Sequence, residues 1–410
     1  MVQRTADIDT HGNEHSDNEE AWTVSDGDGR KYALHGSCDP KFSAVRDAFT
    51  TNFETGEEVG AAVCVYQAGR KVVDLWGGYA DAVRTREWQR DTTVNMMSVA
   101  KAFVATAVAM LVDRGELDLD APVARYWPEF AQNGKSELLV RWVVDHRAGL
   151  PVLRPSLERG AIYDWDAVTS ALAGMKPLWK PGEEAGYHIL TMGFLAGELI
   201  RRLTGLMPGE LIRQEITEPL GIDYNIGITG EEVSRLAEFI PAVEGTIFKV
   251  EELPDEELLK YAWKELPLDE DFNSKAWREA QIPGASGHGN ARAVAKFFGC
   301  LAAGGTLDGV HLLSSDAIDR MASEQHNLTE QVMHRSYHQG LGVLLNSPPI
   351  SPMGPNPKAF GHHGVGGSVG LADREVGIGF AYSMNHMHGR VDNGPRAGRL
   401  KDATFASVYG

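Results

Sequence analysis

The sequence contains little cysteine: three of its 410 residues, at widely separated positions (Cys38, Cys64 and Cys300). No two of them form a Cys-x-x-Cys pair, so the sequence predicts neither a disulfide framework nor a zinc ribbon. Cys64 and Cys300 stand in apolar runs, which is typical of thiols buried in a core. A His-Glu-x-x-His motif and zinc-finger spacing are also missing. We therefore expect no metal ion and no other cofactor.

Positive charge is scarce as well. The chain has 39 lysines and arginines against 57 aspartates and glutamates, which gives a formal net charge of −18 at pH 7. This excess of negative charge argues against a nucleic acid or an anionic membrane as a partner.

Long apolar runs are missing too. No segment reaches the roughly 20 apolar residues that a membrane span requires. Residues 1–7 lack the apolar stretch of a signal peptide, so we expect a soluble, cytoplasmic protein, and its oligomeric state stays open. Residues 1–36 are polar and acidic with few apolar anchors, and we expect them to form a flexible tail.

Strand-like segments lie at the two ends of the sequence, with helical patterns between them. Apolar or alternating runs bounded by turn residues predict strands over 60–67, 71–77, 340–346, 368–373 and 377–384. Because several of these runs are joined by short turns, we expect a largely antiparallel sheet. The predicted fold class is α+β, an antiparallel sheet flanked by helices with a largely helical insertion. Its predicted parts are a discontinuous sheet domain, 37–90 with 285–410, and a helical domain, 91–284.

The most apolar helical run begins beside a serine and a lysine. The run 102–111 is almost wholly apolar, and a helix that is apolar on most sides is buried. Ser98 stands at the start of this helix and Lys101 one turn later, so their side chains share a face. Burial lowers the pKa of a lysine, and a neutral lysine can take the proton of a serine hydroxyl. The pair is therefore a candidate nucleophile and base; a serine cap beside a lysine that reaches water is the alternative.

Two further stretches are candidates for the rest of a catalytic site, which needs a proton shuttle and oxyanion donors. Tyr187 stands in a loop just before the helical pattern of 189–204, where a hydroxyl can point into a cleft. A half-buried structural tyrosine is the alternative. The segment 360–370 is dense in glycine, and glycines let a backbone approach a ligand and leave N–H groups free to donate. The alternative interpretation of this segment is a bulged edge strand in which His362 and His363 are surface residues.

Together these pieces resemble a known superfamily. Ser98-x-x-Lys101, then Tyr187 followed by His188, then His362-His363-Gly364, resemble the serine β-lactamases and penicillin-binding proteins. Within that superfamily the chain looks most like the class C β-lactamase-like carboxylesterases of family VIII. Supporting segments are Asp74–Gly78, Asp113–Asp120, His146–Pro151 and Asn290–Arg292. The resemblance runs from about Cys38 to the C-terminus and implies a β-lactamase/transpeptidase-like fold. It also implies a serine hydrolase that cleaves small carboxylic esters through an acyl-enzyme.

The resemblance implies a role for each matching residue. Ser98 would be the acylated nucleophile. Lys101 and Tyr187 would share the general-base and general-acid work. The backbone N–H groups of Ser98 and Val365 would form the oxyanion hole.

The chain also departs from β-lactamases at two places. His362, His363 and Gly364 occupy the place of the Lys-Thr-Gly triplet, as substrate-binding or supporting residues, and Ile189 stands where the Tyr-x-Asn motif has asparagine. Both departures remove groups that β-lactamases use around the carboxylate and amide of the antibiotic. The resemblance therefore favours a neutral ester over a lactam as the small-molecule substrate.

A second serine motif competes with Ser98. Gly366–Gly370 matches Gly-x-Ser-x-Gly, the nucleophile elbow of α/β-hydrolases, with Ser368 as its serine. That motif needs a helix after the serine, whereas residues 371–375 predict a turn that leads into another strand. We therefore expect that Ser368 is not the nucleophile. The histidines of 362–363 and 386–388 match no metal-binding motif, and we interpret them as surface or supporting residues.

Other functions stay open at this stage. They are an acyltransferase on the same site, an amidase, peptidase or weak β-lactamase, and a catalytically silent binding protein. The intact set of Ser98, Lys101 and Tyr187 argues against the silent protein. Residues 240–283 combine acidic and aromatic side chains, and we expect them to cover one rim of a pocket and to shape the acyl or alcohol site.

Overall fold

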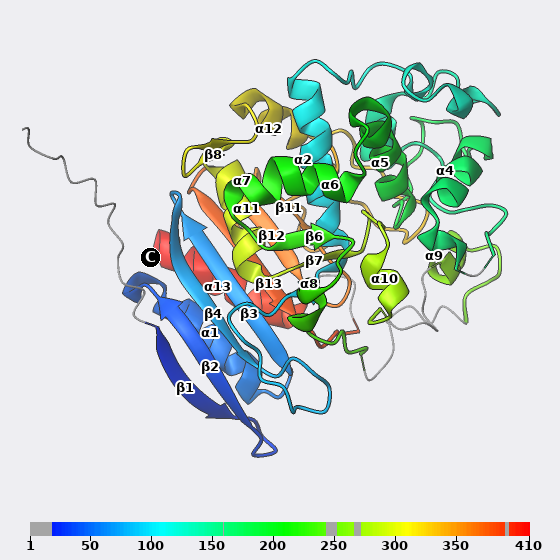
Figure 1. Ribbon diagram of the computed structural model, residues 1–410. Helices are drawn as coiled ribbons and strands as arrows, with labels where there is room; N and C mark the ends of the chain where they lie inside the picture. The colour runs from blue at the N-terminus through cyan, green and yellow to red at the C-terminus, as the bar shows by residue number, and fades with distance from the viewer. Residues whose placement is uncertain (1–18, 159, 243–251, 266–271, 390–392) are drawn as a thin grey trace, which may run out of the picture.

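The computed structural model describes residues 19–158, 160–242, 252–265, 272–389 and 393–410. Within these residues a large β-sheet lies beside a group of helices (Figure 1). The strands are β1 Glu20–Ser25, β2 Lys31–Cys38, β3 Gly60–Gln67, β4 Arg70–Gly78, β5 Val94–Asn95, β6 Tyr224–Ile226, β7 Gly287–Gly289, β8 Thr306–Leu307, β9 Val310–His311, β10 Leu344–Leu345, β11 Phe360–His363, β12 Val369–Asp373 and β13 Ile378–Met384. The helices are α1 Ser43–Glu54, α2 Ala100–Asp113, α3 Val140–Val144, α4 Trp165–Gly174, α5 Thr191–Thr204, α6 Pro208–Ile212, α7 Glu218–Leu220, α8 Glu231–Ser234, α9 Leu258–Glu265, α10 Lys275–Glu279, α11 Ala291–Ala302, α12 Ser315–Met321 and α13 Gly394–Tyr409. Among the described helices, none combines the length and the apolar character that crossing a bilayer would take.

The large sheet has eight strands in the order β1-β2-β4-β3-β13-β12-β11-β10. All neighbouring pairs in it are antiparallel. The central pair, β3 and β13, joins the two ends of the chain, with Phe380 opposite Val65. The predicted α+β fold, with an antiparallel sheet built from both ends of the sequence, is confirmed.

The prediction of a tail over residues 1–36 is wrong for its second half. Residues 20–25 and 31–38 form β1 and β2; β1 pairs with β2, and β2 also pairs with β4. The physical reason is that Val24, Tyr32 and Leu34 alternate with more exposed residues and are buried in the core of the sheet. Residues 1–18 lie outside the described residues.

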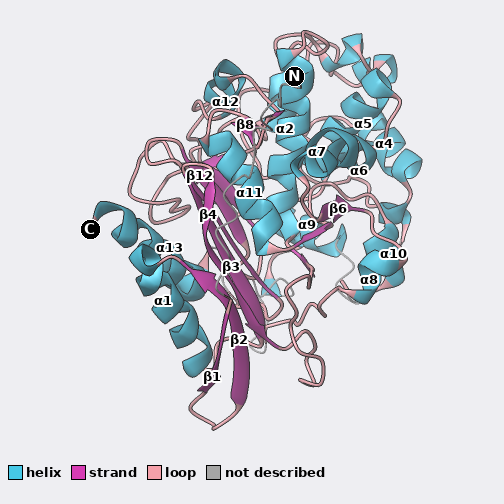
Figure 2. Ribbon diagram, turned by 60° about the vertical axis from the view of Figure 1, so that its left-hand side comes forward, coloured by secondary structure: helices cyan, strands magenta, loops and turns pink. Residues whose placement is uncertain are grey.

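Helices cover both faces of the sheet (Figure 2). Along β3, Ala61, Val63 and Val65 join the core that contains residues of α1 and α13, whereas Ala62, Cys64 and Tyr66 join the core that contains residues of α11. The sequence lets α11 come close to the sheet through a pair of glycines. A Cβ on Gly379 would lie 2.2 Å from the backbone nitrogen of Gly299 in α11. The sheet is therefore the middle of three layers.

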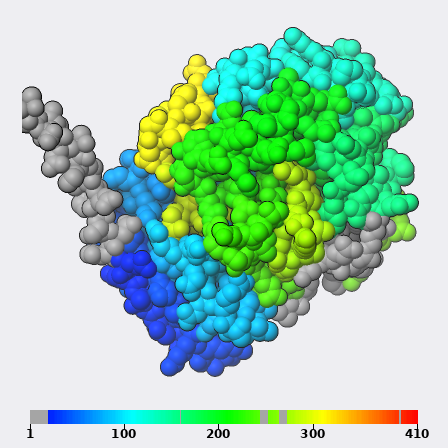
Figure 3. Space-filling model, in the orientation of Figure 1, coloured from blue at the N-terminus to red at the C-terminus, as the bar shows by residue number. Residues whose placement is uncertain are grey.

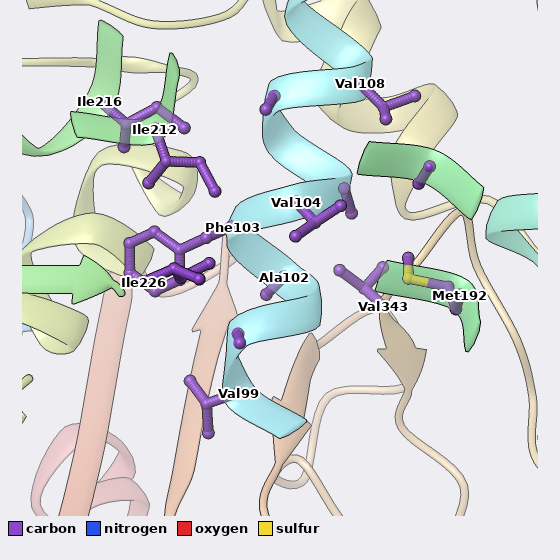
Figure 4. Packing of buried hydrophobic residues seen from close by; sticks show 14 of the residues in the cluster. Val99, Ala102, Phe103, Val104, Val108, Met192, Ile212, Ile216, Ile226 and Val343 are labelled. Carbon is purple, nitrogen blue, oxygen red and sulfur yellow. The ribbon is translucent and has the colours of Figure 1, made fainter. Parts of the chain in front are cut away.

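The predicted apolar helix is α2, and it lies at the centre of the helical part. All residues from Ala100 to Val108 are buried. Figure 4 shows Phe103 beside Ile226 on one side of α2 and Val104 toward Val343 on the other. Because a close-packed interior resists local shifts, this packing fixes the first turn of α2, next to which Ser98 stands.

One predicted strand is shorter in the structure, and one strand of the structure was not predicted. Only Leu344–Leu345 of the predicted segment 340–346 pairs as β10, because Gly340 donates to the carbonyl oxygen of Val343 in a turn and Gly342 has a φ of +70°. Phe360–His363, within the glycine-dense stretch, is itself the strand β11, which the sequence pattern did not predict. The glycine-rich stretch is thus a strand that leads into a loop.

The N-terminal strands and the helical residues form adjoining parts of the surface, blue and cyan to green in Figure 3. The division into a sheet domain and a helical domain over 91–284 stays a prediction. The predicted rim segment 240–283 lies partly outside the described residues. Its described part includes α9, from which Leu259 and Ala262 pack with Val152 and Val332.

Candidate active site

Ser98 lies in the short 3-10 turn Met97–Val99, directly before α2. The side-chain oxygen of Asn95 accepts the N–H of Met97 at 3.0 Å, and Met97 has a φ of +51°. A positive φ is costly for a residue other than glycine and persists only where the surroundings hold it. This turn fixes the Ser98 side chain at the front of the buried helix, as the sequence predicted.

Lys101 is fully buried one turn further on. Its amine nitrogen lies 3.1 Å from Oγ of Ser98 and 2.7 Å from each of the carbonyl oxygens of Ile189 and Gly284. Burial lowers the pKa of Lys101 to about 7. A neutral amine has two N–H groups and one lone pair, which match two carbonyls and one hydroxyl. In that form Lys101 can donate to both carbonyls and accept a hydrogen bond from the Ser98 hydroxyl.

Tyr187 reaches the same place from the loop before α5. The amine nitrogen of Lys101 lies 4.9 Å from the centre of the Tyr187 ring. Burial raises the pKa of Tyr187, a hydrogen bond with the Ser98 side chain opposes this rise, and Tyr337 and Glu330 add to it. The phenol therefore keeps its proton at neutral pH and is a proton donor beside Ser98 and Lys101.

Two histidines hold the loop that carries Tyr187. The backbone N–H of His188 donates to Nδ1 of His146 at 3.1 Å, which places the proton of the neutral His146 ring on Nε2. The His188 ring bonds through Nδ1 to the carbonyl oxygen of Gly186 at 2.5 Å and accepts the N–H of Leu150 on Nε2 at 3.1 Å. Burial lowers the pKa of both histidines, so both rings are neutral. The His146 ring lies 4.8 Å from the Tyr187 ring and supports it from one side.

Gly364 brings the end of β11 against the turn that carries Ser98. A Cβ at this position would lie 2.3 Å from the carbonyl oxygen of Met96 and 3.0 Å from Cβ of Met97, so glycine alone allows this approach. The N–H of Gly364 donates to the carbonyl oxygen of Ser368 at 2.7 Å and closes the loop between β11 and β12. Val365, the next residue of that loop, is partly buried and follows the point of contact directly.

The two histidines of β11 are buried, so their interpretation as surface residues is wrong. Nδ1 of His362 bonds to the carbonyl oxygen of His363 at 2.8 Å, which leaves the lone pair on Nε2. Burial lowers the pKa of His362 well below its ordinary value, and Lys101 and His363 add to this effect. The His362 ring lies 6.3 Å from the Tyr187 ring. This neutral imidazole therefore stands near the place where Ser98, Lys101 and Tyr187 meet.

Ser368 lies in a different environment. Its side chain is buried, and among the described residues its hydroxyl has no hydrogen-bond partner. The strand β12 follows it, where a nucleophile elbow would have a helix. In the described ranges of the chain, no three histidine, cysteine, aspartate or glutamate side chains are grouped as a metal site requires.

Three hydrogen-bonding groups around the site could not be recognised from the sequence pattern. The carbonyl oxygens of Ile189 and Gly284 belong to the backbone, so residue identity gives no sign of them. For Gly284 a signal exists only in the structure, where a Cβ would lie 2.9 Å from the Ile189 carbonyl oxygen. The third group is the carboxylate of Glu330, which accepts the backbone N–H of Tyr187 at 2.7 Å. Nothing in its local sequence distinguishes this glutamate from the others.

Two segments that contributed to the family resemblance, Asp74–Gly78 and Asn290–Arg292, meet beside the sheet. The Asp74 carboxylate, from β4, accepts two bonds from the Arg292 guanidinium of α11, at 2.7 and 2.8 Å. Lys71 donates to the same carboxylate at 3.0 Å. These two segments therefore fasten α11 to the sheet, and they contribute no group to the site itself.

The fold and the convergence of a serine, a buried lysine and a tyrosine define a serine β-lactamase-like protein. Residues 45–405 match the family model described as Beta-lactamase, and the chain belongs to this family. The predicted superfamily and fold are thereby confirmed.

Relatives and solved structures agree with this assignment. The chain is 32% identical over 372 residues to "Esterase/beta-lactamase LipL" of Mycobacterium tuberculosis, covering 86% of this chain and 83% of that protein. It is 29% identical over 198 residues to "Esterase EstB" of Burkholderia gladioli, covering 44% and 49%. A crystal structure of a family VIII carboxylesterase matches with a TM-score of 0.85 at 40% identity, over 91% of this chain and 99% of that one. A penicillin-binding protein homolog from Caulobacter crescentus matches with a TM-score of 0.85 at 38% identity, over the same shares of 91% and 99%.

Proposed function

We propose that this protein is a serine carboxylesterase that cleaves small carboxylic esters through an acyl-enzyme on Ser98. The observation that carries the proposal is the buried Lys101 amine, which lies 3.1 Å from Oγ of Ser98 and 4.9 Å from the centre of the Tyr187 ring. A base of suitable pKa, a nucleophile and a proton donor then meet at one place.

Acylation begins with neutral Lys101 taking the proton of Ser98 while Oγ bonds to the ester carbonyl carbon. The carbonyl oxygen becomes an oxyanion, which the backbone N–H groups of Ser98 and Val365 stabilise. Tyr187 gives its proton to the alkoxy oxygen, the carbon–oxygen bond breaks, and the alcohol leaves. Lys101 then returns a proton to Tyr187, so the net result is the transfer of one proton from Ser98 to the alcohol.

Deacylation runs the same transfers with water. A water molecule gives one proton to the Lys101–Tyr187 pair and bonds to the acyl carbon. The bond between that carbon and Oγ of Ser98 then breaks, and Oγ takes the proton back. The products are a carboxylic acid and the free enzyme.

The environment of His362 supports a neutral ester as substrate. Where β-lactamases carry the lysine of their Lys-Thr-Gly triplet, this chain has His362, and burial holds the pKa of that imidazole well below its ordinary value. At neutral pH it carries no positive charge to attract a substrate carboxylate. The similarity to Esterase/beta-lactamase LipL, to Esterase EstB and to the family VIII carboxylesterase supports an ester as the substrate.

Two serine variants test the proposal on a short-chain p-nitrophenyl ester. Ser98→Ala is expected to lose nearly all turnover, because the acyl-enzyme has no oxygen on which to form. Ser368→Ala is the matched control, since it removes another buried serine hydroxyl, and it is expected to keep turnover. Full activity in Ser98→Ala, with loss in Ser368→Ala, would favour the nucleophile elbow instead.

A further inference from the structure

Glu330 lies in the segment between α12 and β10, outside every motif that pointed to the site. Its side chain is buried, with 3% of the residue exposed. Oε2 accepts the backbone N–H groups of Tyr187 at 2.7 Å and Val332 at 2.9 Å. Oε1 accepts those of Met333 at 2.6 Å and Arg335 at 3.5 Å. These four donors are backbone N–H groups, and one of them belongs to Tyr187.

The turn that contains Glu330 is fastened to the Tyr187 loop at two points. Besides the bond from Tyr187, the N–H of Gln331 donates to the carbonyl oxygen of Ala185 at 2.8 Å. The turn closes on itself, because the N–H of Glu330 donates to the carbonyl oxygen of Arg335 at 2.9 Å. His146 holds the same loop through the neighbouring N–H, that of His188. The backbone on both sides of the Tyr187 side chain is therefore fixed.

A buried carboxylate is costly unless donors surround it, and the backbone N–H groups around Glu330 are such donors. Removing one acceptor atom from this set leaves buried N–H groups without a partner. A carboxylate beside Tyr187 also opposes loss of the phenol proton, and Glu330 contributes to the raised pKa of Tyr187. Both effects keep Tyr187 in place and in its acid form.

We propose that Glu330 is a positioning residue of the active site: through the backbone N–H of Tyr187, its carboxylate holds the Tyr187 hydroxyl where it meets Ser98 and Lys101. The inference rests on the proposed function, because it requires that Tyr187 transfers a proton in the reaction.

Glu330→Gln is the principal variant. It keeps the volume of the side chain, but its NH₂ group cannot accept the N–H groups that one carboxylate oxygen accepts now. Glu330→Asp keeps the charge on a shorter side chain and is the conservative variant. Glu198→Gln is the matched control, because Glu198 is also a buried carboxylate but bonds to Trp165, Arg201 and Arg202. Circular dichroism and thermal unfolding establish that each variant is folded.

The decisive measurement compares Glu330→Gln in the wild-type and Tyr187→Phe backgrounds, by kcat/KM on a short-chain p-nitrophenyl ester. In the wild type we expect a loss of about 10- to 100-fold, the scale of a small misplacement of a catalytic group. In Tyr187→Phe the same change is expected to cost less than about twofold, because no hydroxyl remains to be positioned. Glu330→Asp is expected to keep more activity than Glu330→Gln, and Glu198→Gln to remain close to wild type.

An equal loss in both backgrounds would overturn the positioning role and leave the proposed function standing. Wild-type activity in Glu330→Gln would also overturn the positioning role. If Glu330→Gln does not fold, Glu330→Asp takes its place, and an equal loss of kcat/KM in the wild-type and Tyr187→Phe backgrounds would overturn the role. If Tyr187→Phe alone keeps full activity, the proton transfer by Tyr187 fails, and the positioning role fails with it. The single Tyr187→Phe variant therefore separates the two failures.

Discussion

The amine of Lys101 lies over the ring of Tyr187, with 4.9 Å between the nitrogen and the ring centre. The two side chains come from distant parts of the sequence, and each has a pKa shifted by burial, that of Lys101 downward to about 7 and that of Tyr187 upward. At neutral pH the first is ready to accept a proton and the second to donate one. The proposed acid–base chemistry of the site depends on this pair.

The pKa of Lys101 sets the expected dependence of activity on pH. Only the neutral amine accepts the Ser98 proton, and its pKa is about 7, so kcat/KM is expected to rise from pH 5 to 8 and then to level off. At pH values below the midpoint, kcat/KM should fall by about tenfold per pH unit, since one proton is involved. The measurement follows the release of acid from an alkyl ester by chromatography, which avoids a pH-sensitive chromophore. A midpoint near that of an ordinary lysine would contradict the burial argument, and Lys101→Arg should show little activity at any pH.

Removal of the Tyr187 hydroxyl is expected to slow turnover without unfolding the protein. Tyr187→Phe should lower kcat by about two to four orders of magnitude, the usual scale for a positioned proton donor. Its loop is held through backbone groups, so the thermal unfolding temperature should change little. Tyr224→Phe is the control, since Tyr224 is a buried tyrosine stacked on Phe103 and its hydroxyl has no bond within the described residues. Equal activities of the two variants would speak against the proton transfer.

A methyl group at Gly364 is expected to push the loop that carries Val365 away from the turn that carries Ser98. Gly364→Ala places a Cβ 2.3 Å from the carbonyl oxygen of Met96, so the loop with Val365 must move away from Ser98. The expected loss of kcat is about 10- to 1,000-fold, the range seen when an oxyanion donor is displaced. In Gly398→Ala nothing lies within 4 Å of the new Cβ, and this control in α13 should gain up to about 1 kcal/mol of stability. Wild-type kcat in Gly364→Ala would contradict the placement of Val365 as a donor.

The pair of Asp74 and Arg292 is expected to affect stability and not catalysis. Arg292→Leu leaves a carboxylate with 6% side-chain exposure, with Lys71 and the more distant Arg90 as its cationic neighbours among the described residues. Breaking such a pair should cost about 2 to 4 kcal/mol in urea unfolding, with unchanged KM in the folded protein. Arg114→Leu removes a more exposed pair with Glu215 and should cost less than about 1 kcal/mol. If Arg292→Leu lowers the free energy of unfolding as little as Arg114→Leu does, the buried pair contributes little to stability.

The parts of the site that are close in sequence were predictable from physical chemistry. Ser98 and Lys101 are three residues apart on an apolar helix, so their shared face and the burial of the lysine follow from helix geometry. The loop of Tyr187 and the glycine-dense segment 360–370 were candidates from their position and composition, each with a structural alternative. Only the resemblance gave Tyr187, His362 and Val365 roles in one site, because no local rule says that distant loops meet. Their roles remain proposals that the variants above test.

The remaining groups act through tertiary structure that the sequence pattern does not contain. The helix predicted from Ile189 begins at Thr191, and the Ile189 carbonyl binds Lys101 instead. Glu330 acts on Tyr187 through a backbone N–H, which no residue type reveals. The strands β1 and β2 carry alternating apolar side chains, but their acidic surroundings masked that pattern.

The most direct test of the proposed mechanism is to label the nucleophile itself. The folded protein is treated with a fluorophosphonate, digested, and the modified peptide is mapped by mass spectrometry, with esterase activity followed in parallel. We expect one phosphonyl group on Ser98 and a loss of activity in step with this labelling. A label on Ser368, or loss of activity while Ser98 stays unmodified, would contradict it.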